Sequence, residues 1–113
     1  MAYDEAAAER LRAALKRTRN IAEQKMFGGI CFMWRGNMLC GTGWRGVMFR
    51  VGKKQEAAAL KLPGASRMVL AGRRLPGFIW VKPDRCKGAA LNKGIALAKK
   101  YVGPLPAKKK RRK

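Results

Sequence analysis

Residues 26–34 read Met-Phe-Gly-Gly-Ile-Cys-Phe-Met-Trp, an apolar run that two glycines interrupt. Such a run is typical of a β-strand, and the pair of glycines predicts a bulge or a close backbone approach. Residues 35–37, Arg-Gly-Asn, are a turn signal, and residues 38–41 are mostly apolar again. After a second turn at 43–46, residues 47–51 predict a third strand. Because the three strands are close neighbours in sequence, we expect an antiparallel meander.

The remaining chain predicts three helices and two further strands. An amphipathic helix over residues 4–18 begins at the capping residue Asp4 and places Ala7, Leu11 and Leu15 on one face. The other elements are a helix at 53–62, strands at 68–70 and 78–81, and a helix at 87–101. The order α-β-β-β-α-β-β-α predicts an α+β fold of two layers, with helices packed on an antiparallel sheet of about five strands.

Charge is distributed unevenly along the chain. Lysine and arginine number 27 and aspartate and glutamate 6, so the formal net charge is +21 without any histidine. Residues 1–23 hold five bases and four acids, whereas residues 24–113 hold 22 bases and only Glu56 and Asp84 as acids. Small soluble domains usually carry a net charge of about 2–8 in magnitude. A surface this basic attracts polyanions, and nucleic-acid phosphate is the polyanion that we favour.

One folded domain and a basic tail are expected. Hydrophobic residues make up 48% of the chain, too many for a disordered protein, and a body of about 100 residues suffices for one core. We assign the domain to residues 1–106 and a disordered polybasic tail to residues 107–113. No apolar run approaches the ~20 residues of a membrane span, and no secretory signal is recognised. The expectation is a cytoplasmic protein without a membrane partner, with nucleoid association as a further option.

The sequence offers little material for catalysis. Histidine, the usual general base, is absent, and Ser66 is the one serine. Cys31, Cys40 and Cys86 form no CxxC pair, and we interpret them as reduced, inert thiols. If the turn at 35–36 has two residues, Cys31 and Cys40 face each other across the hairpin. No enzymatic activity, cofactor, metal or small-molecule substrate is predicted.

Residues 41–46, Gly-Thr-Gly-Trp-Arg-Gly, match the dinucleotide-binding pattern GxGxxG. That pattern requires a following helix, but a predicted strand follows here, so we interpret the stretch as a hairpin connection. Trp44, beside Arg45, is the candidate for an exposed ring that stacks on unpaired bases. The candidate nucleic-acid contacts are Arg45, Arg73, Arg74, Lys82, Arg85, Lys87, Lys108, Lys109, Lys110, Arg111, Arg112 and Lys113.

Several short motifs follow one another in a fixed order. They are Lys-Met-Phe-Gly-Gly-Ile-Cys-Phe-Met at 25–33, Gly-Asn-Met at 36–38, Phe-Arg-Val-Gly at 49–52, and Met68 with Gly72-Arg73 and Leu-Pro-Gly-Phe-Ile-Trp-Val at 75–81. Together they resemble the N-terminal domain of the TfoX/Sxy family of bacterial competence regulators, over about residues 1–106. The motif Met26, Phe27, Gly28 and Gly29 is interpreted as structural.

The resemblance implies a small α+β domain, similar to the two-layer secretion-chaperone-like fold, with no catalytic residues. The best-known members act with a cyclic-AMP receptor type activator to turn on DNA-uptake genes. Those members carry a second, helical domain, whereas this sequence is interpreted as a stand-alone, single-domain member. It also departs from the family in being more basic.

Two functions are carried forward from the sequence. The first is a non-enzymatic regulatory or accessory domain that binds nucleic acid, largely non-specifically, or assists a DNA-bound transcription regulator. The alternative is a protein-interaction module that binds an acidic protein partner, with a homodimer as one option for its assembly. The charge imbalance favours the first.

Overall fold

The computed structural model describes residues 4–26, 28–43, 46–70 and 72–107. The residues outside the described ranges therefore include Phe27, Trp44, Arg45 and residues 108–113 of the expected tail. The elements, in chain order, are α1 (Glu5–Ala14), β1 (Ile21–Met26), β2 (Gly29–Trp34), β3 (Asn37–Gly43), β4 (Gly46–Arg50), the short 3-10 helix η1 (Lys53–Gln55), α2 (Glu56–Ala59), β5 (Ala65–Leu70), β6 (Arg73–Val81), the 3-10 helix η2 (Pro83–Arg85) and α3 (Gly88–Val102).

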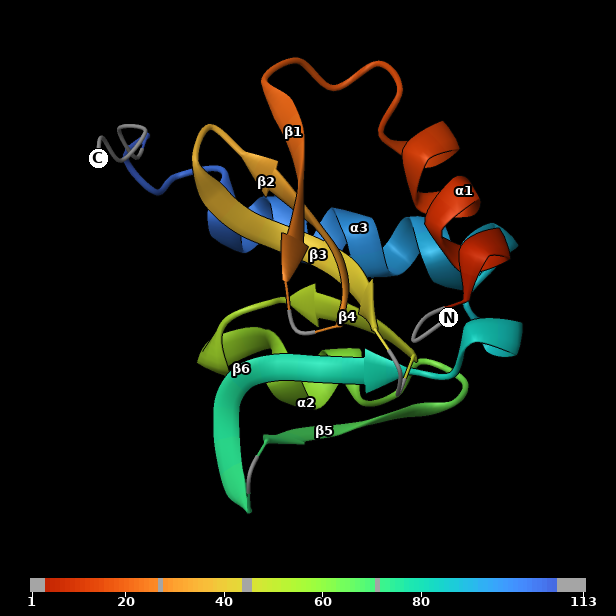
Figure 1. The fold of residues 1–113 in the computed structure, drawn as a ribbon. Helices are drawn as coiled ribbons and strands as arrows, with labels where there is room; N and C mark the ends of the chain where they lie inside the picture. Colours follow the sequence, from red (N-terminus) through yellow and green to blue (C-terminus); the bar gives the residue numbers. More distant parts are fainter. Residues whose placement is uncertain (1–3, 27, 44–45, 71, 108–113) are drawn as a thin grey trace.

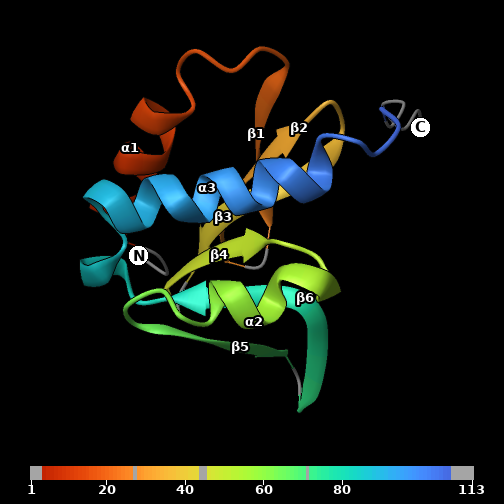
Figure 2. The same cartoon turned by 180° about the vertical axis from the view of Figure 1, so that it is seen from behind.

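The strands form one antiparallel sheet of six, in the order β1-β2-β3-β4-β6-β5. The helices pack on one face of this sheet, where α3 crosses β3 and β4, α1 contacts β3, and α2 contacts β6 (Figures 1 and 2). The predicted two-layer α+β class is confirmed, with six strands where about five were expected. Among the described residues, no helix is long and apolar enough to cross a membrane.

The additional strand is β1, which the sequence did not predict. Its residues, Ile-Ala-Glu-Gln-Lys-Met, carry little apolar alternation, and its four middle residues, 22–25, are all exposed. The strand exists because it pairs with β2 along its whole length, from Ile21 opposite Trp34 to Met26 opposite Gly29. An ion pair supports it, since the guanidinium of Arg12 on α1 donates to both carboxylate oxygens of Glu23 at 2.6 and 3.0 Å.

Because β1 pairs with β2, Gly28 and Gly29 do not form a strand bulge, and each glycine has a different role. β1 ends and β2 begins on either side of residues 27–28, and Gly28 has a φ of 73°. A Cβ on Gly29 would collide with the carbonyl oxygen of Thr42 on β3, so the expected close backbone approach is confirmed at Gly29. The bulge prediction at this pair is wrong, because the register between β1 and β2 is continuous.

The irregularity lies instead between Phe32 and Met33, where the pairing of β2 with β3 shifts. The turn between these strands does have two residues, since Trp34 pairs with Asn37. The shift nevertheless places Cys31 opposite Gly41 and Phe32 opposite Cys40. The expectation that Cys31 and Cys40 face each other is therefore wrong, and their side chains belong to different hydrophobic clusters.

Two hydrophobic clusters lie on the two faces of the sheet. The larger one lies between the sheet and the helices, with Phe32 and Phe49 from the strands and Leu11 and Ile95 from the helices among its buried residues. The smaller one lies on the helix-free face and contains Cys31, Met48, Met68 and Trp80. Neighbouring residues of β2, β4 and β6 alternate between the clusters, as the period of a β-strand requires. In β3, where the register shifts, Leu39 and Cys40 both belong to the larger cluster. Met48 and Met68 are both buried in the smaller cluster, where their flexible side chains fill the space around Trp80.

The backbone of α3 approaches the sheet closely at Gly94. A Cβ at this position would lie 2.7 Å from the ring atoms Cε2 and Cζ of Phe49 on β4. Glycine therefore allows the helix backbone to approach the sheet, and the apolar residues one turn to each side, Leu91 and Ala98, are buried against it.

Candidate functional site

The predicted nucleic-acid contacts within the described residues fall into two groups. Arg73 and Arg74 begin β6, whereas Lys82, Arg85 and Lys87 follow its other end, and all five are exposed. β6 has nine residues, so the two groups are separated by the length of a strand. The structure does not bring them together at one site. Arg45 and the tail contacts lie outside the described residues, as does the stacking candidate Trp44.

Glu56 is one of the two acids of the basic segment, and it is not exposed at the surface. Its side chain is buried, and one carboxylate oxygen lies 3.0 Å from Nη2 of Arg74 and 3.6 Å from Nη1 of Arg67. Asp84 is thus the one exposed acid among the described residues from 24 onward. Arg74 is partly neutralised by this contact, so it is a weaker phosphate ligand than the sequence suggested.

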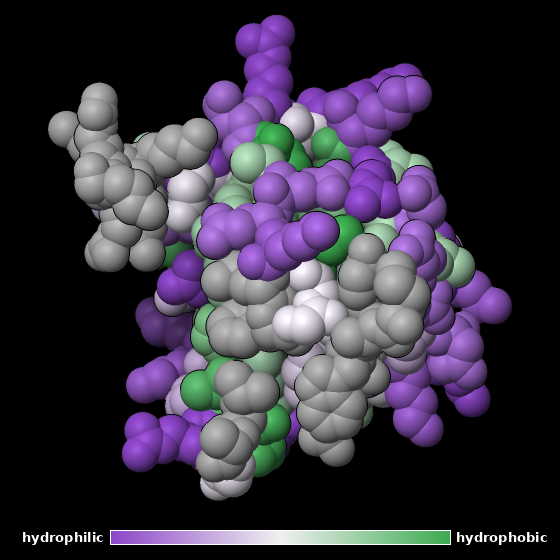
Figure 3. Space-filling view, viewed as in Figure 1, coloured by the Kyte–Doolittle hydropathy of each residue, from purple (hydrophilic) through white to green (hydrophobic). Residues whose placement is uncertain are grey.

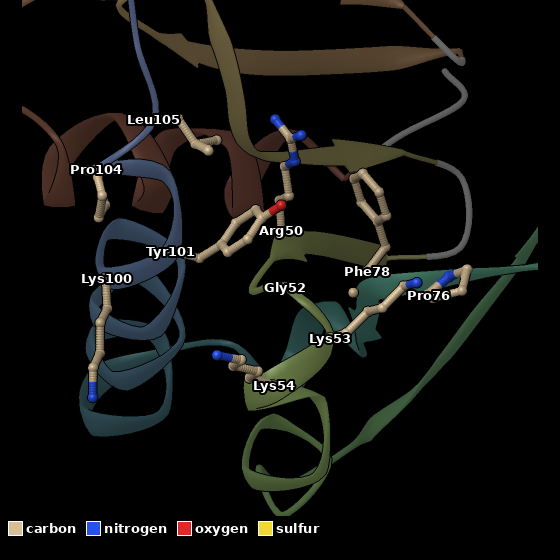
Figure 4. Close-up of a pocket in the computed structure, with 11 residues that line it drawn as sticks. Arg50, Gly52, Lys53, Lys54, Pro76, Phe78, Lys100, Tyr101, Pro104 and Leu105 are labelled. Atoms are coloured by element: carbon tan, nitrogen blue, oxygen red, sulfur yellow. The ribbon is translucent and has the colours of Figure 1, made fainter.

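A groove on the surface gathers cations that the sequence analysis did not select. It has a volume of about 600 Å³ and lies where β4 ends, β6 bends and α3 ends (Figure 4). Among the described residues that line it, none is acidic. The lining consists of Arg50, Gly52, Lys53, Lys54, Pro76, Gly77, Phe78, Lys100, Tyr101, Pro104 and Leu105.

Two glycines shape the floor of the groove. The N–H groups of Val51 and Gly52 both donate to the carbonyl oxygen of Gly77, at 2.8 and 3.0 Å, which holds the end of β4 against β6. Gly52 has a φ of 82°, and a Cβ there would collide with the ring of Tyr101. The Nε2 amide of Gln55 donates to the carbonyl oxygens of Val51 and Leu97, at 2.9 and 2.8 Å, and so joins η1 to α3. These contacts hold the ends of β4 and α3 and the bend of β6, which form the walls of the groove, in fixed positions relative to one another.

Arg50 lies between two aromatic rings in the groove. Its Cζ atom is 5.5 Å from the ring centre of Tyr101 and 5.9 Å from that of Phe78, within the range of cation–π attraction. Figure 4 shows the two rings on opposite sides of Arg50. Both rings are half-buried, so each keeps an accessible part. Lys53 and Lys54, which are exposed, extend from η1 beside them (Figure 4). The groove therefore combines positive charge with flat apolar surface.

Sequence reasoning missed this groove because its residues come from three distant segments. A signal existed in Gly52-Lys53-Lys54 and in Lys99-Lys100-Tyr101, where bases adjoin a glycine or an aromatic residue. Nothing in either segment indicates that it meets the other.

A second hollow lies beside the edge strand β5. It has a volume of about 610 Å³ and is lined by Arg67 and Lys82 together with Ser66, Val69 and Trp80. On the helix-free face seen in Figure 3, hydrophilic side chains project around much of the molecule and hydrophobic ones lie between them. Of the predicted contacts that the structure describes, Lys82 alone lines the hollow beside β5.

The three thiols are free and buried. Burial raises the pKa of Cys31 and of Cys86 to about 11, and raises the pKa of Cys40 further, because the thiolate is desolvated. All three are thus protonated and weakly nucleophilic near neutral pH, as expected for inert thiols. Among the described residues, no group of three histidine, cysteine, aspartate or glutamate side chains is placed to hold a metal ion.

Comparisons with known proteins give no match, whether to family models, to curated proteins or to solved structures. The resemblance to the TfoX/Sxy family therefore stays a prediction from the motifs alone. Evidence for function comes from the surface.

Proposed function

We propose that this protein is a non-enzymatic nucleic-acid-binding domain whose affinity is largely electrostatic and independent of sequence. The observation that carries the proposal is the scarcity of exposed acids among the described residues from 24 onward, where Asp84 is the one exposed carboxylate. Ion pairs among the described residues use Arg12, Arg67 and Arg74, while the other described lysines and arginines make none.

These unneutralised cations lie on several sides of the fold. They include Lys25 on β1, Lys53 and Lys54 on η1, Lys82 after β6 and Lys93 on α3. An arrangement spread over several elements fits a ligand whose charge is also repeated and extended. The phosphates of nucleic acid meet this condition, and binding releases their condensed counterions, which favours association at low salt.

The proposal predicts a steep dependence of binding on salt. We expect the full chain to bind a fluorescently labelled DNA duplex at low salt, with log K falling linearly with log salt concentration. The slope should be about −0.9 for each phosphate that a cation neutralises, and sequences of equal length should bind alike. Absence of binding at low salt, or binding indifferent to salt, would refute the proposal.

A variant that ends after Ala107 separates the contribution of the tail from that of the body. The described elements end at Val102, so this truncation leaves them intact. We expect the slope to become shallower but to remain clearly negative, because the body retains most of the excess charge. Loss of all affinity with the tail would show that the body does not contribute. Selective capture of one acidic protein, without nucleic acid, would favour the interaction module instead.

The biological setting is part of the same proposal. The motifs that resemble the TfoX/Sxy family support an accessory role beside a DNA-bound transcription regulator in the cytoplasm of a bacterium. Co-purification of such a regulator in the presence of its DNA, and its loss after nuclease treatment, would be the expected result.

A further inference from the structure

The groove at the end of β4 contains aromatic rings as well as cations, and binding by charge alone does not need those rings. Flexible lysines alone are sufficient to attract phosphate, and they are found over much of the surface. In the groove, four cations accompany the accessible parts of Tyr101 and Phe78, namely Arg50, Lys53, Lys54 and Lys100. Aromatic rings beside cations are the arrangement that holds an unpaired base and its phosphate together.

We infer that this groove binds a nucleotide unit of single-stranded nucleic acid, with its base against Tyr101 or Phe78 and its phosphates on Lys53 and Lys54. The inference rests on the proposed function and adds a preference for single strands over duplex. Charge complementarity supports the occupant, because none of the described lining residues is acidic.

The size of the groove supports the same occupant. Its volume of about 600 Å³ lies within the range of about 300–1,000 Å³ found for small-ligand pockets. A single nucleotide is a ligand of that class, whereas the bases of a duplex stay stacked and paired unless energy is spent to extrude them. A duplex can therefore place phosphates on the rim but no base against the rings.

Internal hydrogen bonds hold the walls of the groove in position. Gly77 accepts two backbone hydrogen bonds from the end of β4, and Gln55 joins η1 to α3. Tyr101 is held against Gly52, where a side chain would displace it. Preorganised rings lose little freedom when a base stacks on them, which favours binding.

The test compares two lysine pairs in the full-length protein. Lys53→Gln/Lys54→Gln removes two cations from the groove, and Lys16→Gln/Lys25→Gln removes two exposed lysines elsewhere. All four side chains are exposed, so both variants should fold like the parent. Fluorescence anisotropy with an oligothymidylate and with a duplex of equal charge measures both affinities at several salt concentrations.

We expect the groove variant to lose about tenfold or more in affinity for oligothymidylate, and the control variant much less. The salt slope for the single strand should become shallower by about 1.4 in the groove variant, which corresponds to two phosphate contacts. For the duplex, the two variants should lose affinity to a similar extent. A result in which both variants lose single-strand affinity equally would overturn the inference and leave the proposed function intact. If neither nucleic acid binds at low salt, the proposed function itself fails.

A second measurement needs no variant. Stacking of a base shifts the NMR signals of the ring protons on which it lies, and we expect the ring signals of Tyr101 and Phe78 to shift on titration with oligothymidylate but not with duplex. Unchanged ring signals at saturating oligothymidylate would overturn the inference, even where lysine signals shift.

Discussion

Gly94 provides a test of how closely α3 packs against the sheet. In an exposed helix interior, replacing glycine by alanine stabilises a protein by about 1 kcal/mol, because alanine loses less backbone entropy on folding. At Gly94 the added Cβ would lie 2.7 Å from two ring atoms of Phe49, whereas carbon atoms prefer separations of about 3.5–4.0 Å. The substitution Gly94→Ala therefore sets helix propensity against a steric clash.

The clash has no inexpensive relief. Phe49 is fully buried, and its backbone pairs with Cys40 on one side and Ile79 on the other. Either the ring moves into a packed core or α3 lifts from the sheet, and overpacking of this kind costs about 1–3 kcal/mol. After subtraction of the propensity gain of about 1 kcal/mol, we expect Gly94→Ala to lower the free energy of unfolding by up to about 2 kcal/mol.

Urea denaturation, followed by circular dichroism, measures this free energy. Ala96→Gly is the matched control, because Ala96 is an exposed residue of the same helix and reports propensity alone, with an expected loss of about 1 kcal/mol. In the background Phe49→Leu, where the clashing ring is absent, Gly94→Ala should be less destabilising by about 0.5 kcal/mol or more. If Gly94→Ala instead stabilises the protein by about as much as Ala96→Gly destabilises it, the close approach of α3 to Phe49 is refuted.

Three further predictions concern capping, thiols and net charge. Asp4→Ala should lower the free energy of unfolding by about 1 kcal/mol, because Oδ1 of Asp4 accepts the N–H of Ala7 at 3.0 Å, whereas Asp4→Asn should leave it nearly unchanged in urea denaturation. Cys31 and Cys86 have pKa values raised to about 11, so their ultraviolet thiolate absorbance should appear only above about pH 10 in the folded protein and near pH 9 after unfolding. The unfolded state therefore releases these two protons at a lower pH than the folded state does. The contribution of the two thiols to the free energy of unfolding is present below about pH 9 and is lost between about pH 9 and 11. A thiolate signal at pH 8 in the folded protein would contradict the burial of these thiols. Finally, the net charge of +21 implies self-repulsion that salt screens, so the Tm should rise with moderate sodium chloride, and a Tm that falls would contradict this account.

Much of the fold could be predicted because local patterns are strong in this chain. The apolar spacing in the last helix predicted residues 87–101, and α3 spans Gly88–Val102. Asp4 was expected to cap the first helix and does so, although α1 ends at Ala14 and not at residue 18. The strand after residue 46 was likewise found from its apolar residues and the glycines before it.

The candidate site was less predictable. The sequence identified the excess of cations, yet the residues selected from it lie at both ends of β6 or outside the described residues. The sequence analysis selected residues near 45 and 73–74, whereas the groove joins residues near 50, 77 and 101.

The amino-acid sequence by itself determined the class of the fold, the positions of the helices and the basic character of the surface, because propensity, periodicity and charge depend on each residue and its neighbours. Tertiary structure alone decided the strand β1, the register shift that separates Cys31 from Cys40, and the groove between β4, β6 and α3. β1 and the register shift depend on backbone pairing between neighbouring strands, whereas the groove depends on packing between segments far apart in the chain. β1 in particular is polar and gains its strand conformation from hydrogen bonds to β2, which no local pattern encodes.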